Sequence, residues 1–137
     1  MKNIYKIHYI IFFLALFFSK AIAEPTFVQS KSIDDQFYLG LNFNNDGTKM
    51  YTVRAERDGK TDSVIEHILT SAYDISTATV NNTKVVHRGS GGGLSFVPTQ
   101  AVFNNDGTKM FIVNHDGNKS VDEYLLSTAF DCFNSYI

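Results

Sequence analysis

Short apolar runs alternate with polar, turn-forming segments along the chain from about residue 38 onward. Two of these runs, 50–53 (Met-Tyr-Thr-Val) and 110–113 (Met-Phe-Ile-Val), are apolar almost without interruption. A strand with one solvent face alternates apolar and polar residues, whereas a nearly continuous apolar run indicates a strand covered on both faces. The pattern therefore predicts short strands in sheets that have neighbours on both sides. The expected strands are 26–31, 38–44, 49–54, 64–69, 83–88, 99–104, 109–114 and 121–126.

The chain contains an internal duplication. The octapeptide Phe-Asn-Asn-Asp-Gly-Thr-Lys-Met occurs at 43–50 and again, without a change, at 103–110. The match continues on both sides of the octapeptide. Downstream, after a loop that is three residues shorter in the second copy, 64–69 aligns with 121–126 and 71–74 with 128–131. Upstream, 27–29 aligns with 85–87. The predicted organisation is repeat one at about 26–82, repeat two at about 83–131, and a divergent tail at 132–137.

Each copy of the octapeptide carries an Asp-Gly pair between two apolar runs, Asp46-Gly47 in the first copy and Asp106-Gly107 in the second. Glycine accepts a positive φ angle, and an aspartate side chain hydrogen-bonds nearby backbone amides, so Asp-Gly at such a place is a strong hairpin signal. These four residues are predicted to form structural turns that join the first two strands of each copy.

A calcium loop is the alternative interpretation of this segment. Asn42, Asn44 and Asp46 follow the alternate-ligand spacing that opens such a loop. The second copy, however, places Val102 at the first ligand position, and Val53 stands where the first copy would need a bidentate glutamate. The turn explains the pattern without a metal, and no metal site is predicted.

The duplicated segments resemble the repeats of exported bacterial proteins of the β-propeller type. In those repeats a hairpin Asp-Gly-Thr-Lys-Met-(Tyr/Phe)-x-Val precedes a segment Glu-Tyr-x-Leu-Ser-Thr-Ala-(Phe/Tyr)-Asp. Residues 46–53 and 123–131 match these two patterns, and the first copy departs from the second with His67, Thr70 and Ser71. The resemblance covers nearly all of 26–131. It implies blades of four antiparallel strands and no particular activity, because propellers host binders, scaffolds and enzymes alike.

The expected fold is all-β, with two four-stranded antiparallel propeller-blade-like repeats that form a fragment of a larger β-propeller. Propellers have about four to eight blades, so two repeats do not close a ring, and the open sheet faces would leave apolar surface exposed. Because 26–31 corresponds to a fourth strand, the repeats are permuted by one strand. Truncation or a frame shift after residue 131 and the assembly of several chains into one ring both remain open.

The first 23 residues predict a secretory signal peptide. Lys2 and Lys6 precede an apolar run at 10–18, and Ala21 and Ala23 form a small-x-small cleavage site. An apolar run of this length is far shorter than the roughly 20 residues that a membrane-spanning helix needs. We therefore expect 1–23 to be removed, 24–137 to be the β-propeller-like repeat region, and the protein to be exported to the periplasm or outside the cell without a stable membrane anchor.

Net charge and cysteine content argue against nucleic-acid binding and against an internal disulfide. The chain holds 12 Lys and Arg against 14 Asp and Glu, and loss of Lys2, Lys6 and Lys20 with the signal peptide would leave nine against 14, a net charge of about −5. No stretch is basic enough to follow a phosphate backbone, which argues against nucleic acid as a partner. Cys132 is the single cysteine, so no internal disulfide forms. No catalytic constellation recurs, and no cofactor is expected.

The loops that differ between the copies are the predicted place of binding, since variable loops on a constant scaffold commonly carry recognition. Their polar residues are Arg54, Glu56 and Arg57 in the first copy and Asn114 and His115 in the second. The leading hypothesis is an exported, non-catalytic module for binding or scaffolding, whose ligand is an unidentified protein or glycan. The alternatives are a fragment of a propeller-type enzyme, such as an exported hydrolase or lactonase, and a surface protein that self-associates through open blade faces.

Overall fold

The computed structural model describes residues 24–34, 37–55, 62–86, 97–115, 119–133 and 135–136. Within these ranges the regular structure is β, apart from one short 3-10 turn at Ile75–Thr77. The all-β antiparallel class that the sequence predicts is therefore confirmed. No helix in the described part of the chain is both long and apolar enough to cross a membrane. The predicted signal peptide lies outside the described residues.

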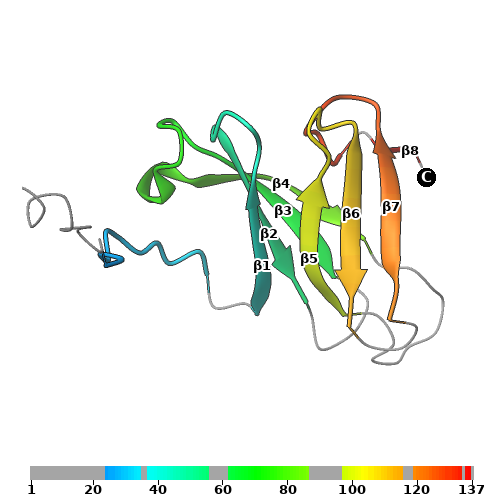
Figure 1. Cartoon of the computed structure of the whole chain (residues 1–137), viewed down its shortest axis with the longest axis horizontal. Helices are drawn as coiled ribbons and strands as arrows, with labels where there is room; N and C mark the ends of the chain where they lie inside the picture. Colours follow the sequence, from blue (N-terminus) through cyan, green and yellow to red (C-terminus); the bar gives the residue numbers. More distant parts are fainter. Residues whose placement is uncertain are drawn as a thin grey trace, which may run out of the picture.

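The strands form two antiparallel sheets in which each strand pairs with its neighbour in sequence (Figure 1). The first sheet contains β1 (Tyr38–Phe43), β2 (Lys49–Arg54), β3 (Ser63–Ile68) and β4 (Thr79–Val85). The second sheet contains β5 (Pro98–Phe103), β6 (Lys109–Asn114), β7 (Val121–Leu126) and the two-residue β8 (Ser135–Tyr136). The boundaries of β1–β3 and β5–β7 agree with the predicted strands to within about one residue.

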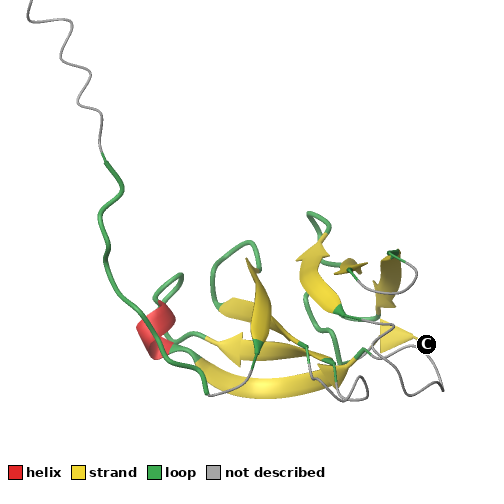
Figure 2. Cartoon of the chain, turned by 90° about the horizontal axis from the view of Figure 1, so that it is seen from below, coloured by secondary structure: helices red, strands yellow, loops and turns green. Residues whose placement is uncertain are grey.

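Two of the predicted strands need correction. The segment 26–31 is not a strand. It runs as an extended loop past the 3-10 turn (Figure 2), where Gln29 Nε2 donates to Asp74 Oδ1 at 3.1 Å and Lys31 Nζ donates to the Ser76 carbonyl at 3.2 Å. The fourth strand begins at residue 79 rather than 83. It is an edge strand whose side chains are mostly exposed, so its sequence Thr-Val-Asn-Asn-Thr-Lys-Val carries little of the apolar pattern by which strands are recognised.

The divergent tail also differs from the expected picture. Residues 135–136 pair with Leu125 and Leu126 at one end of β7, so the tail supplies a short fourth strand to the second sheet. Its sequence does not align with β4, which is why the duplication alone did not predict it.

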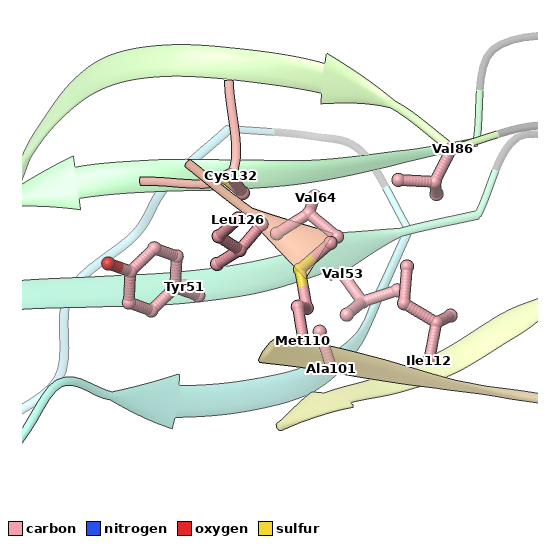
Figure 3. Close-up of a cluster of buried hydrophobic side chains, with 9 residues drawn as sticks. All are labelled: Tyr51, Val53, Val64, Val86, Ala101, Met110, Ile112, Leu126 and Cys132. Carbon is pink, nitrogen blue, oxygen red and sulfur yellow. The ribbon is translucent and has the colours of Figure 1, made fainter. Parts of the chain in front are cut away.

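The main core lies between the two sheets (Figure 3). The first sheet contributes one face, on which Tyr51 and Val53 of β2 lie beside Val64 of β3, and these three side chains are at most 1% exposed. The second sheet contributes Met110 and Ile112, both fully buried. Ala101, Leu126, Cys132 and Val86 complete the cluster.

The two sheets pack head to tail, by which we mean that one face of the first sheet contacts the opposite, non-equivalent face of the second. Tyr51 and Val53 correspond by duplication to Phe111 and Val113, but these two residues do not face the first sheet. The second sheet instead packs through the alternate residues, such as Met110 and Ile112, on its opposite face, because successive side chains of a strand point to opposite sides. The interface thus joins one face of the repeat to the other face of the next copy.

The expectation that both faces are covered holds for one repeat only. All four residues at 50–53 in β2 are buried, whereas in β6 Phe111 is half-buried and Val113 is 40% exposed. The sequence signal is the same in both strands. The difference arises because no described segment packs on the far side of the second sheet.

Candidate functional site

The duplicated Asp-Gly turns form with the same hydrogen bonds in both copies. Asp46 Oδ1 accepts from the backbone nitrogen of Thr48 at 2.9 Å and from its hydroxyl at 2.6 Å, and the Asp106 carboxylate accepts from Thr108 at 3.0 Å and 2.6 Å. These bonds, with the threonine hydroxyl as the largest cause, lower the pKa of both carboxyl groups below the ordinary value. The carboxylates therefore stabilise the turns.

Each turn also holds the segment that follows the third strand of its repeat. The backbone nitrogen of Tyr73 donates to the Gly47 carbonyl at 2.9 Å, and that of Phe130 donates to the Gly107 carbonyl at 2.8 Å. The glycines have φ angles of +72° and +70°, and a Cβ atom on either would lie 2.4 Å or less from the aromatic ring above it. The octapeptide is thus a structural clamp, which accounts for its identity in the two copies.

The predicted binding residues at the variable loops have different environments. Asn114 is buried, and its Nδ2 donates to Asp122 Oδ2 at 3.0 Å and to Ser120 Oγ at 3.1 Å. His115 is exposed beside it. Arg54 is partly buried at the end of β2, where Nη2 lies 3.4 Å from Ser63 Oγ. Asn114 and Arg54 therefore contact the bases of their loops.

Two other predicted binding residues, Glu56 and Arg57, lie outside the described residues. Among the described members of this set, His115 is the one that is exposed on the surface. Asp122, which is not among the predicted binding residues, is the partner that positions Asn114. A signal for it was present, because Asp122 occupies the position of Ile65 in the first copy, and a carboxylate at an apolar position requires a buried polar partner.

A hollow of about 350 Å³ lies on the face of the first sheet that points away from the second sheet. Its one imidazole is His67, which is 2% exposed and whose Nε2 lies 3.0 Å from Thr52 Oγ1. Burial lowers the pKa of His67, so the neutral form is favoured in the folded chain. The hollow is lined by Lys31, Ser32, Ile33, Met50, His67, Ala78, Thr79 and Val80.

The polar groups of this hollow have partners within the chain. The His67 imidazole is paired with the Thr52 hydroxyl, and the Asp34 carboxylate raises the pKa of His67 against the larger effect of burial. Lys31 Nζ donates to the Ser76 carbonyl. Within the described ranges, no three His, Cys, Asp or Glu residues gather closely enough to hold a metal ion. The geometry is suited to packing or to the binding of a small apolar group.

Cys132 belongs to the core. Its side chain is fully buried between the sheets, and burial raises the pKa of the thiol to about 12. A thiol of this kind stays protonated at neutral pH, and it is out of reach of a substrate in solution.

The far side of the second sheet has apolar side chains exposed in the described chain, and we call it the open face. Val113, Val121 and Leu125 on this face are 40%, 64% and 54% exposed. Lys109 and Glu123 form an ion pair across it at 2.6 Å. The open face comprises Lys109, Phe111, Val113, Val121, Glu123 and Leu125, which β6 and β7 place on one side through direct cross-strand pairing.

Comparisons of the chain with protein-family models, with curated proteins and with solved structures gave no significant match. A functional conclusion therefore depends on the chain's own geometry, namely two sheets that each carry the duplicated octapeptide, the turns that it forms, the loops that differ between the copies and an open apolar face.

Proposed function

We propose that the chain is an exported, non-catalytic repeat module of the β-propeller type that serves recognition or scaffolding. The observation that carries this proposal is the head-to-tail packing of two homologous sheets. A contact that joins one face of a repeat to the other face of the next copy can be repeated indefinitely, and its rotation decides whether the array closes into a ring.

The contacts between the first strands of the two sheets favour a radial arrangement. Gly40 of β1 lies so close to β5 that a Cβ atom on it would be 2.7 Å from the Thr99 carbonyl oxygen. Gln100 Nε2 donates to the Leu41 carbonyl at 3.0 Å. The first strands thus approach each other at backbone distance, as is expected of strands nearest the axis of a propeller.

The distribution of polar residues favours binding over catalysis. Asn44 and Asp46, which recur in the second copy, are used in the turns, where Asn44 Oδ1 accepts from the Lys49 backbone nitrogen at 2.9 Å. The residues that differ between copies lie at the loops between the second and third strands. A constant scaffold with variable loops is the arrangement of a recognition module, and a protein or a glycan is the ligand class that we propose.

Export and catalysis can be tested separately. We expect a fusion of residues 1–23 to alkaline phosphatase to be active in the periplasm, because that enzyme needs its disulfides, and a fusion without residues 10–18 to be inactive. The chain expressed from its complete reading frame should not hydrolyse 4-nitrophenyl acetate or γ-butyrolactone, with or without calcium. Hydrolysis that one polar substitution abolishes at unchanged thermal stability would overturn the non-catalytic assignment.

Binding is tested with a printed glycan array and a matched pair of variants. Replacement of the exposed His115 by Ala should weaken binding to the retained glycan, whereas replacement of Thr128 by Ala, at the opposite end of the second sheet from the variable loops, should not. Equal loss in both variants, or no binding to glycans or to a panel of purified secreted proteins, contradicts the loop assignment.

A further inference from the structure

We infer that the open face of the second sheet binds a second copy of this chain, through the face of that copy's first sheet that points away from its own second sheet. We call this second surface the outer face. The inference rests on the proposed repeat architecture and adds the partner, the two surfaces and the polarity of the contact.

The open face carries the residues that align with one side of the internal contact, and two of them, Val113 and Val121, are identical to valines that are buried there. Val53 and Val64 in that contact are 1% and 0% exposed, while their equivalents Val113 and Val121 are 40% and 64% exposed. The aligned pairs are Lys49 and Lys109, Tyr51 and Phe111, Val53 and Val113, Val64 and Val121, Glu66 and Glu123, Ile68 and Leu125. One repeat unit has its partner sheet inside the chain, and the same surface on the other unit has none among the described segments.

The polar contacts of the internal interface specify what the partner must present. Lys49 Nζ pairs with Glu66 Oε2 at 3.1 Å and also donates to the Phe130 carbonyl of the other sheet at 3.1 Å. The Tyr51 hydroxyl donates to the same carbonyl at 2.5 Å. An ion pair on one sheet and a carbonyl on the next therefore form the polar part of the contact.

The open face already holds the first half of this arrangement, because Lys109 and Glu123 are paired at 2.6 Å. The residue that corresponds to Phe130 is Tyr73. Both have positive φ angles, 56° and 60°, and both sit over the glycine of an Asp-Gly turn, so their carbonyls have equivalent places. In the contact between copies, Lys109 Nζ donates to the Tyr73 carbonyl. Phe111 has no hydroxyl, so this contact has one hydrogen bond fewer than the internal one.

The outer face of the first sheet is already covered at its centre, where Met50, Thr52 and His67 are 2–3% exposed, so the receiving surface consists of the exposed apolar side chains around that centre. Leu41 lies opposite Thr52 in the β1–β2 pairing and is 52% exposed, whereas its equivalent Ala101 is buried in the internal interface. Val80 lies opposite His67 and is 60% exposed. Tyr73, which packs on Phe43 with ring centroids 5.5 Å apart, is 56% exposed on the same face.

The open and outer faces are different surfaces, so the contact is heterologous, and this makes complementation the decisive experiment. Two variants, each expressed from the complete reading frame, disable one face each: Val121→Glu on the open face and Leu41→Glu on the outer face. Lys119→Glu, an exposed change in the β6–β7 loop, is the control. Because the changed residues are exposed within the chain, far-ultraviolet circular dichroism and the urea midpoint should stay close to those of the parent chain.

Sedimentation equilibrium over a range of concentrations measures the association. We expect the parent chain and Lys119→Glu to self-associate. Val121→Glu and Leu41→Glu should each show a dissociation constant raised by about tenfold or more, because a carboxylate would be buried without a partner. An equimolar mixture of the two glutamate variants should form a 1:1 dimer, since each variant keeps the face that the other lacks.

Two results would overturn the inference. The first is a parent chain that stays monomeric at every concentration, and the second is a mixture that fails to associate although the parent does, which would indicate contact between two identical faces. Either result leaves the export and glycan-binding tests untouched. Conversely, a catalytic activity would overturn the proposed function and leave the complementation result standing, so the two failures can be distinguished.

Discussion

Truncating the same residue in both copies of the repeat measures how much the packing between the sheets stabilises the chain. Val53 and Val113 correspond by duplication and lie in strands of the same length, but Val53 is 1% exposed in the core and Val113 is 40% exposed on the open face. Replacement of either by Ala lowers strand propensity in a similar way. The difference between the two variants therefore isolates the packing contribution.

The expected magnitudes follow from the burial of the removed atoms. Val→Ala removes two methyl groups, and the loss of their transfer from water costs ~1.6 kcal/mol when they are fully buried. The cavity left in a core that relaxes only partly adds about 1 kcal/mol. Val53→Ala should therefore lower the free energy of unfolding by ~2.5 kcal/mol. Val113→Ala leaves no enclosed cavity and removes atoms that are already partly hydrated, so its cost should be ~1 kcal/mol or less.

Urea unfolding provides the assay. The chain has seven Tyr and no Trp, so tyrosine fluorescence and far-ultraviolet circular dichroism report the transition. The protein concentration is kept below the onset of association, because Val113 belongs to the open face. Equal slopes with denaturant show that the same two-state transition is compared. If the two variants lose the same free energy within about 0.5 kcal/mol, the head-to-tail packing between the sheets is wrong.

Three further predictions concern the turn, the thiol and the imidazole. Gly47→Ala should lower the free energy of unfolding by about 1–3 kcal/mol, because φ is +72° and the new Cβ meets the Tyr73 ring. Adding Tyr73→Ala to this variant should cost less than Tyr73→Ala costs in the parent chain, because the two changes affect the same contact. A neutral effect of Gly47→Ala would contradict the clamp. Cys132 should react with a disulfide reagent only after unfolding in urea, and reaction of the native chain at the rate of a small thiol would show that it is accessible. Burial lowers the pKa of His67 in the folded chain, whereas the unfolded chain binds a proton there near the ordinary pKa of 6.5. The free energy of unfolding should therefore fall as the pH drops below about 6.5. If the urea midpoint of His67→Gln has the same pH dependence as that of the parent chain, His67 is not the cause.

The turns illustrate what local chemistry can predict. The conformation of Asp46-Gly47 and Asp106-Gly107 is determined by the residues of the turn itself. Only glycine accepts the required φ without strain, and the aspartate oxygen accepts a hydrogen bond from the amide two residues ahead. The apolar strands β2 and β6 were likewise predicted from the order of their residues. The edge strand β4 and the displaced segment 26–31 were not, because an exposed polar strand has the composition of a loop and pairing depends on what lies beside it.

The candidate surfaces depend on tertiary structure to different degrees. His115 could be found as an exposed residue of a variable loop, whereas the burial of Asn114 against Asp122 became visible only when the loop base was folded. The structure also shows that the octapeptide clamps the segment after the third strand, a contact between residues far apart in sequence.

By itself, the sequence determined the all-β class, the duplication and the positions of the hairpin turns, because each of these depends on residues that are neighbours along the chain or in a strand pair. Only the tertiary structure decided which side of each sheet is buried. Met50 to Val53 and Met110 to Val113 are apolar on both sides alike, yet the first strand is covered twice and the second once. Burial depends on what packs against a sheet, so the equivalent valines Val53 and Val113 lie in the core in one repeat and on an open face in the other.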